Sequence, residues 1–180
     1  HEITGKTIGI IGYGNMGSSF AKKLMGFDCR ILAYDKYKDG FGDEYVTESA
    51  MEDLYRDCDI VSLHLPLTPE TQYFADLDFF KRFHKNIYLI NTARGKCLNT
   101  AHLVAALESG KVSGACLDVL EYESASFEQI QNDELPAPLK YLLNSNRVVL
   151  TPHIGGWTYE SNYKMSKVIA EKMLGVLRTS

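Results

Sequence analysis

Short apolar runs alternate with stretches of helical periodicity along most of the 180-residue chain. Six of these runs predict strands, at residues 7–11, 30–34, 60–65, 87–91, 113–117 and 148–151. Strands that alternate with helices form parallel sheets, and runs that are apolar throughout are typical of strands covered on both faces. Because crossover connections are almost always right-handed, the pattern predicts an α/β fold with a doubly wound parallel sheet.

Two segments interrupt this alternation. Residues 35–46 are polar and contain two glycines, which predicts a loop with at most a short stub of strand. Residues 122–147 have no strand pattern, but two prolines precede an apolar stretch at 139–143, which predicts a short helix on a long excursion. Long loops in compact domains are usually functional or mobile, and the role of this excursion stays open.

Length, charge and cysteine content exclude several classes of protein. A chain of 180 residues can form a single domain with a full hydrophobic core. Its net charge of −4 offers no general attraction for nucleic acid or anionic lipid, and no apolar run reaches the roughly 20 residues of a membrane helix. Cys29, Cys58, Cys97 and Cys116 form no Cys-x-x-Cys pair, which favours a reducing, cytoplasmic setting. We expect neither nucleic acid, membrane nor metal as a partner.

The sequence GYGNMG at residues 12–17 follows the first predicted strand and opens the first predicted helix. In this context the glycines are typical of a Rossmann-type dinucleotide-binding domain. Gly12 permits a tight turn, Gly14 lets the backbone approach a pyrophosphate, and Gly17 lets helix and strand pack closely. Asn15 and Met16 belong to the helix N-terminus, whose free N–H groups attract anions. Turn glycines spaced by chance are the alternative, but the flanking strand and helix favour a phosphate cradle, our name for residues 12–17.

An acidic residue, Asp35, ends the second predicted strand, 18 residues beyond Gly17. A carboxylate at this place accepts hydrogen bonds from ribose hydroxyls and repels a 2′-phosphate, so we predict NAD as the cofactor. Lys36 and Lys38 weaken the preference over NADP, because either could receive a phosphate. A solvated turn aspartate is the ordinary alternative.

Polar side chains also follow three later strands. Arg94 follows the fourth of the six, Asp118 the fifth and His153 the last, with Glu121 and Glu123 shortly after Asp118. Ligands of open α/β sheets bind beyond the carboxyl ends of the strands. Arginine suits capture of a carboxylate, histidine exchanges protons near neutral pH, and a nearby carboxylate favours and orients an imidazolium. Together these groups can reduce a 2-oxo acid, although each alone could be an ordinary surface or loop residue.

Other reactive side chains have plainer interpretations. His64 ends a strand but has no acidic partner nearby in sequence, so we interpret it as structural or as lining the cofactor site. His84 and His102 fall in helical stretches and are interpreted as surface residues. Cys97 has no histidine close in sequence to act as its base, so we expect inert packing rather than a nucleophile.

Several motifs resemble the NAD-binding domain of the D-isomer-specific 2-hydroxyacid dehydrogenases. They are GKTIGIIGYG at residues 5–14, HLPLT at 64–68, NTARG at 91–95, LDV at 117–119 and TPHIGG at 151–156. The resemblance implies that Arg94 binds the substrate carboxylate and carbonyl oxygen, that His153 is the acid/base and that Glu123 pairs with it. It further implies cofactor contacts: Asp118 to the nicotinamide amide, Asp35 to the adenosine ribose, and others from Pro66, Thr92, Ala93 and Gly155.

The sequence departs from the family pattern in three places. Ser124 follows Glu123 where the family usually has proline, so Glu121 remains a competing partner for His153. The stretch from Glu123 to His153 is longer than usual, and the crossover after Asp35 is shorter. Together with Trp157, which could line the site or contact a partner domain, the long stretch suggests a branch similar to phosphoglycerate dehydrogenases, with 3-phosphoglycerate as a candidate substrate.

Family members also carry a second domain that closes over the substrate. We therefore expect residues 1–180 to form a single NAD-binding domain that is a fragment of a longer two-domain enzyme, and to be inactive or nearly so alone. A homodimer through this domain is the expected assembly. The rival interpretation from another class is a dinucleotide-sensing regulatory domain, similar to a corepressor, without turnover.

Overall fold

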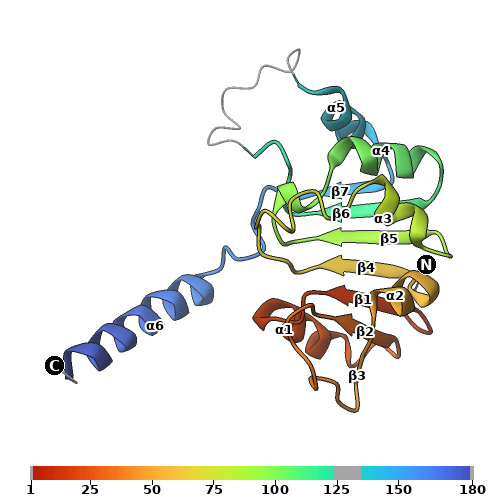
Figure 1. The fold of residues 1–180 in the computed structure, drawn as a ribbon. Helices are drawn as coiled ribbons and strands as arrows, with labels where there is room; N and C mark the ends of the chain where they lie inside the picture. Colours follow the sequence, from red (N-terminus) through yellow and green to blue (C-terminus); the bar gives the residue numbers. More distant parts are fainter. Residues whose placement is uncertain (1, 124–134, 179–180) are drawn as a thin grey trace.

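The computed structural model describes residues 2–123 and 135–178, which form one parallel sheet flanked by helices (Figure 1). Its strand order is β3-β2-β1-β4-β5-β6-β7. The strands are β1 (Thr7–Ile11), β2 (Arg30–Tyr34), β3 (Val46–Glu48), β4 (Ile60–Leu63), β5 (Ile87–Asn91), β6 (Val112–Leu117) and β7 (Val148–Leu150). The predicted α/β fold with a parallel sheet is confirmed. The loop predicted at residues 35–46 leads into β3, which shares only Val46 with that range, and two predicted strands end earlier than expected, β4 by two residues and β7 by one.

Helices occupy most of the connections between strands, and the last helix follows the final strand. They are α1 (Asn15–Leu24), α2 (Met51–Asp57), α3 (Leu77–Arg82), α4 (Thr100–Glu108), α5 (Ala137–Asn144) and α6 (Tyr159–Arg178), with a 3-10 turn at Gly95–Cys97. Side chains that cap helix amides explain two of the starts: Asp76 accepts from Phe79 N at 2.8 Å, and Asn99 accepts from His102 N at 3.0 Å. The short helix expected in the long excursion is α5. The rest of that excursion, residues 124–134, lies outside the described residues.

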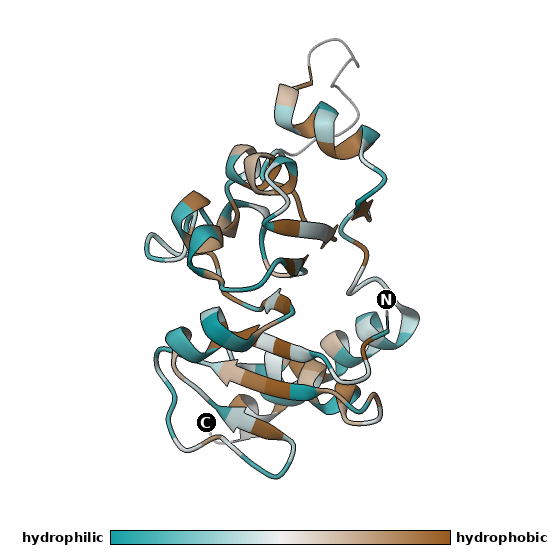
Figure 2. Cartoon of the chain, turned by 90° about the vertical axis from the view of Figure 1, so that its right-hand side faces the viewer, coloured by the Kyte–Doolittle hydropathy of each residue, from teal (hydrophilic) through white to brown (hydrophobic). Residues whose placement is uncertain are grey.

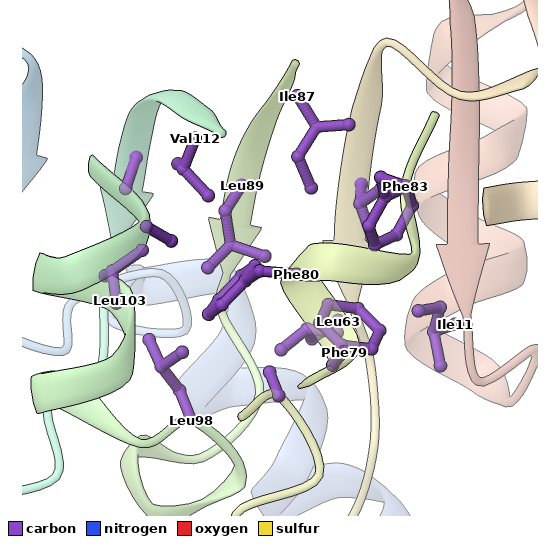
Figure 3. Close-up of a cluster of buried hydrophobic side chains, with 14 of the residues drawn as sticks. Ile11, Leu63, Phe79, Phe80, Phe83, Ile87, Leu89, Leu98, Leu103 and Val112 are labelled. Atoms are coloured by element: carbon purple, nitrogen blue, oxygen red, sulfur yellow. The ribbon is translucent and has the colours of Figure 1, made fainter. Parts of the chain in front are cut away.

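The core has two parts because side chains alternate between the faces of a strand. On one face, Ile8 and Ile10 of β1 pack with Ala21 and Leu24 of α1. On the other, Ile11 joins a larger cluster beneath α2 to α5, in which Phe80, Leu89 and Leu103 are all 0% exposed (Figure 3). Burying each such side chain contributes about 1.5–3 kcal/mol, so these two layers hold the helices against the sheet.

One face of β5 to β7 departs from the expectation that the strands are covered on both sides. Val149 is 60% exposed, and Tyr88 and Cys116 are also exposed. The helix that follows β7, α6, extends away from the sheet (Figure 1), and Trp157 just before it is 79% exposed. Brown, hydrophobic residues lie along the strands, while teal, hydrophilic residues are frequent in the loops (Figure 2). Along α6, apolar residues such as Ile169 and Met173 are exposed. No helix in the described part of the chain is both long and apolar enough to cross a membrane.

The strands end in register at one edge of the sheet, and this alignment positions the site. Ile11 pairs with both Tyr34 and Leu63. Across the other half of the sheet, the pairing runs from Leu63 to Asn91, from Asn91 to Leu117 and from Leu117 to Leu150. Every loop that carries a predicted site residue therefore leaves the sheet from the same row.

Candidate active site

The phosphate cradle follows β1, at the point where the order of strands in the sheet reverses. From β1 the chain moves outward to β2 and β3, then returns to place β4 on the other side of β1. Gly12 has φ of +92°, and a Cβ there would lie 2.6 Å from His64 O. A Cβ on Gly17 would lie 2.1 Å from Gly12 O. Both positions exclude a side chain, which explains why this turn between β1 and α1 needs glycine.

Gly14 differs from these two, because a Cβ there would meet no atom within 4 Å. It is also the N-cap of α1 and has no side chain with which to accept hydrogen bonds from the first-turn amides. Asn15 and Met16, whose N–H groups belong to that turn, are exposed. Open space in front of unsatisfied helix amides fits a diphosphate group.

A cavity of about 600 Å³ adjoins the phosphate cradle. Its lining comprises Ile11, Gly12, Gly14, Tyr34, Asp35, Lys36, Tyr37, His64, Leu65, Pro66, Thr68, Pro69, Glu70, Thr71 and Phe74. The Asp35 carboxylate accepts from Tyr13 N at 2.8 Å and from Tyr37 N at 2.9 Å. Since an ionised carboxylate has about four acceptor positions, Asp35 can also accept from ribose hydroxyls.

His64 and Pro66 both line this cavity, as the cofactor-lining interpretation of His64 requires. His64 Nε2 lies 2.9 Å from Ser62 Oγ, and its ring lies 5.3 Å from that of Phe20. Burial lowers the pKa of His64 to about 4, so the ring is neutral at physiological pH. His84 is exposed as expected, but His102 is not simply a surface residue, because its Nδ1 accepts from Leu77 N at 3.2 Å and so satisfies an amide at the start of α3.

Asn91, which the sequence did not single out as a side chain with a role, shapes the loop that carries Arg94. It is fully buried at the end of β5. Its Oδ1 accepts from Ala93 N at 3.0 Å, and its Nδ2 donates to Arg94 O at 3.2 Å. Ala93 is buried, while Thr92 and Arg94 are exposed at the sheet edge. A buried asparagine at the end of an apolar strand is the signal that could have identified this role.

Close backbone packing brings the arginine loop against the loop after β6. A Cβ on Gly95 would lie 1.9 Å from Leu120 O, so only glycine allows this approach. Leu120 N in turn donates to Glu123 Oε1 at 2.6 Å, and Glu123 Oε2 lies 2.9 Å from His153 Nδ1. Arg94, Glu123 and His153, with Asp118, form what we call the polar rim. These contacts connect the loops that follow β5, β6 and β7.

The Asp118 carboxylate anchors the loop that carries His153. It is 9% exposed, and its carboxylate accepts from Thr151 Oγ1 at 2.6 Å and from the N–H groups of Ile154 and Gly155 at 2.9 Å each. Burial alone would raise the pKa of Asp118, but these hydrogen bonds outweigh it and hold the pKa below its ordinary value. His153 has φ of +54°, so this anchor also stabilises an uncommon backbone conformation. Three of the acceptor positions of Asp118 are occupied, which leaves at most one for a nicotinamide amide.

The structure distinguishes the two glutamates that the sequence left as alternatives. Glu121 Oε1 accepts from the Tyr73 hydroxyl at 2.8 Å, and its Oε2 accepts from Thr100 N at 2.9 Å. Its carboxylate therefore joins the loop before α3 to the start of α4, whereas Glu123 is the residue beside His153.

Cys97 is buried, and burial raises the pKa of its thiol above the ordinary value. A buried thiol with a raised pKa carries little thiolate at neutral pH and is a poor nucleophile. The geometry thus agrees with inert packing three residues after Arg94.

The fold and the site together define a dinucleotide-binding domain whose sheet edge carries an arginine and a hydrogen-bonded histidine–carboxylate pair. Residues 1–155 match the family model of the D-isomer specific 2-hydroxyacid dehydrogenase, NAD binding domain. The chain belongs to that family, and the resemblance seen in its motifs is confirmed.

Several relatives support this assignment. Glyoxylate reductase of Thermofilum pendens is 37% identical over 98% of this chain and 50% of its own length, and hydroxypyruvate reductase of Thermotoga maritima is 35% identical over 96% and 53%. The NAD complex of a D-isomer specific 2-hydroxyacid dehydrogenase from Lactobacillus delbrueckii ssp. bulgaricus superposes with a TM-score of 0.89 at 33% identity, covering 99% of this chain and 55% of that one. The chain thus spans about half the length of these relatives. Their names give no support to the phosphoglycerate-like branch or to 3-phosphoglycerate as substrate.

Proposed function

We propose that this chain is the cofactor-binding half of an NAD-dependent enzyme that interconverts a 2-oxo acid and a D-2-hydroxy acid. The observation that carries the proposal is the polar rim, in which the 2.9 Å contact between His153 and Glu123 lies on the same sheet edge as Arg94. When bound, the cofactor would supply the redox chemistry: NADH would donate a hydride to the substrate carbon in reduction, and NAD⁺ would accept one from it in oxidation. The protein supplies orientation and charge.

In this proposal His153 exchanges a proton with the substrate oxygen. Its Nδ1 faces Glu123, which leaves Nε2 as the nitrogen that is able to reach a substrate. During reduction of a 2-oxo acid, His153 gives its proton to the developing alkoxide, and in the reverse direction it takes the proton back. Glu123, itself fixed by Leu120 N, keeps the ring in this orientation, and Asp118 keeps the loop in place.

Arg94 is proposed to bind the substrate carboxylate. Its exposed guanidinium donates to Ala93 O at 2.6 Å through Nη1, and its remaining N–H groups are suited to a bidentate carboxylate contact. We expect Arg94→Lys to raise the KM for the 2-oxo acid about tenfold or more, because an ammonium cannot reproduce the two-point contact. Steady-state kinetics at saturating NADH measure this effect. An unchanged KM would contradict carboxylate capture.

NADH oxidation by the intact protein, assayed with a panel of 2-oxo acids, tests the proposed activity directly. The panel contains glyoxylate, hydroxypyruvate, pyruvate, an aromatic 2-oxo acid and phosphohydroxypyruvate. We propose that side-chain selectivity comes mainly from a second domain outside these 180 residues, because the half described here provides only one wall of the cleft. Without the other wall, water is not excluded and the reactant is poorly positioned, so this half alone is expected to be nearly inactive.

A dinucleotide-sensing domain without turnover remains the alternative that this assay separates from an enzyme. It would bind NADH through the same phosphate cradle but oxidise none with any acid of the panel. The proposed enzyme is favoured because the rim residues are positioned by specific contacts from Asn91, Leu120 and Asp118, which a sensor does not need.

We also propose that the domain forms a homodimer. Exposed apolar side chains occur both on the open face of β5 to β7, such as Val149, and along α6, such as Ile169 and Met173. Covering such surfaces with a second copy would remove apolar area from water. Size-exclusion chromatography with light scattering is expected to give twice the mass of one chain, and a monomeric mass at micromolar concentration would contradict the dimer.

A further inference from the structure

A bridge of three side chains forms part of the cavity lining beside Asp35, and the proposed chemistry does not use it. Lys36 Nζ forms an ion pair with Glu70 Oε1, and the Tyr37 hydroxyl donates a hydrogen bond to Glu70 Oε2. All three side chains line the cavity, together with Asp35. The bridge thus joins the loop after β2 to the loop after β4, which lie on opposite sides of β1.

The loop that carries Glu70 is held by its own hydrogen bonds. Thr71 Oγ1 donates to Pro66 O and accepts from Thr68 N at 2.9 Å, while Thr71 N donates to Thr68 O at 3.1 Å. These bonds form a closed turn around residue 70. The position of the Glu70 carboxylate therefore follows from the loop backbone rather than from the ion pair alone.

The bridge bears on whether the two lysines near Asp35, Lys36 and Lys38, are available to bind a phosphate. Either lysine could in principle receive the 2′-phosphate of NADP, which would oppose the preference that Asp35 sets. Lys38 Nζ instead donates to Tyr13 O at 2.9 Å, and Lys36 is paired with Glu70. Of these two lysines only Lys36 lines the cavity, and its ammonium is engaged by Glu70. With Glu70 in place, neither lysine is available to receive a 2′-phosphate.

We infer that Glu70 is a determinant of NAD specificity, and that it acts by holding Lys36 away from the place of a 2′-phosphate. The inference rests on the proposed binding of NAD and adds a residue from a loop that follows a different strand from the one carrying Asp35. Asp35 accepts hydrogen bonds from the ribose hydroxyls, while Glu70 pairs with the Lys36 ammonium, which would otherwise bind the 2′-phosphate. The bridge is partly exposed, with side-chain accessibilities of 57% for Lys36 and 43% for Glu70, so salt screens it.

The test compares the dissociation constants of NADH and NADPH by calorimetric titration of the protein. We expect Glu70→Gln to lower the ratio of the NADPH to the NADH dissociation constant about tenfold at low salt, and to do so less at high salt. In the Lys36→Ala background, Glu70→Gln is expected to change the ratio less than threefold, since no lysine is released. Glu108→Gln, which removes an exposed acid at the far end of α4, serves as the matched control for loss of one negative charge.

Two results would overturn the inference while leaving NAD binding intact. One is a ratio that Glu70→Gln changes by less than threefold. The other is an equal decrease in both backgrounds, which would mean that Glu70 repels the phosphate directly. Failure of the unmodified protein to bind NADH would instead overturn the proposed function, and the inference with it.

Discussion

Replacing His153 by glutamine is expected to lower kcat by about 10²- to 10⁴-fold in the intact protein, equivalent to roughly 2.7–5.4 kcal/mol of barrier. Glutamine can still donate a hydrogen bond but cannot exchange a proton at neutral pH. The affinity for NADH should change little, because the phosphate cradle follows β1 and Asp35 follows β2, whereas His153 follows β7 at the far side of the sheet. Single-turnover absorbance at 340 nm with saturating 2-oxo acid measures the chemical step.

Two further variants separate chemistry from backbone conformation at this position. His153 has φ of +54°, a region that asparagine adopts more readily than glutamine. His153→Asn should therefore be as inactive as His153→Gln if proton transfer is what has been lost. His84→Gln, at an exposed histidine after α3, should retain full activity. Turnover of His153→Gln at the unmodified rate would refute the role of His153.

The second large effect is expected at Gly14. A methyl group there meets no protein atom within 4 Å, so Gly14→Ala should fold and lose no more than about 1 kcal/mol of stability, since alanine is a poorer N-cap than glycine. The same methyl group would occupy the space in front of the first-turn amides of α1, and we expect it to weaken NADH binding about 100-fold. Calorimetric titration with NADH and thermal denaturation of the same sample measure the two properties separately.

Two other glycines provide the comparison. A Cβ on Gly17 would lie 2.1 Å from Gly12 O, so Gly17→Ala should lose about 1–3 kcal/mol of stability as well as NADH affinity. Gly26, just after α1, also has open space around it but lies outside the phosphate cradle, and Gly26→Ala should change neither property. If Gly14→Ala bound NADH as tightly as Gly26→Ala, the diphosphate would not lie in front of α1.

Much of the fold was predictable because its signals are local. The apolar runs of β1, β2 and β5 match the predicted strands residue for residue, since each run is bounded by turn residues. The ends of β4 and β7 were less certain, because an apolar run can continue for a residue or two after strand pairing stops. The exposed face of β5 to β7 contradicts the inference from continuous apolarity, since an apolar residue in a strand does not itself indicate what covers it.

Like the fold, the candidate site has parts that could be predicted from the sequence and parts that could not. The cradle glycines could be assigned from sequence because they act on neighbours within a few residues along the chain. The choice between Glu121 and Glu123 could not, because it depends on contacts with Thr100 and His153, which lie about 20 and 30 residues away. Lys36 and Glu70 lie 34 positions apart in the sequence. No pattern near either residue indicates that the two side chains pair.

The order of strands and helices, the glycine turn and the kinds of polar group that follow each strand can be read from the amino-acid sequence. These features follow from side-chain volume, backbone freedom and periodicity, which act over a few residues. Which of those polar groups meet depends on how the strands pair in the folded chain. The register that aligns Leu63, Asn91, Leu117 and Leu150 brings distant loops to one edge. There Leu120 N holds Glu123 beside His153, while Tyr73 and Thr100 engage Glu121.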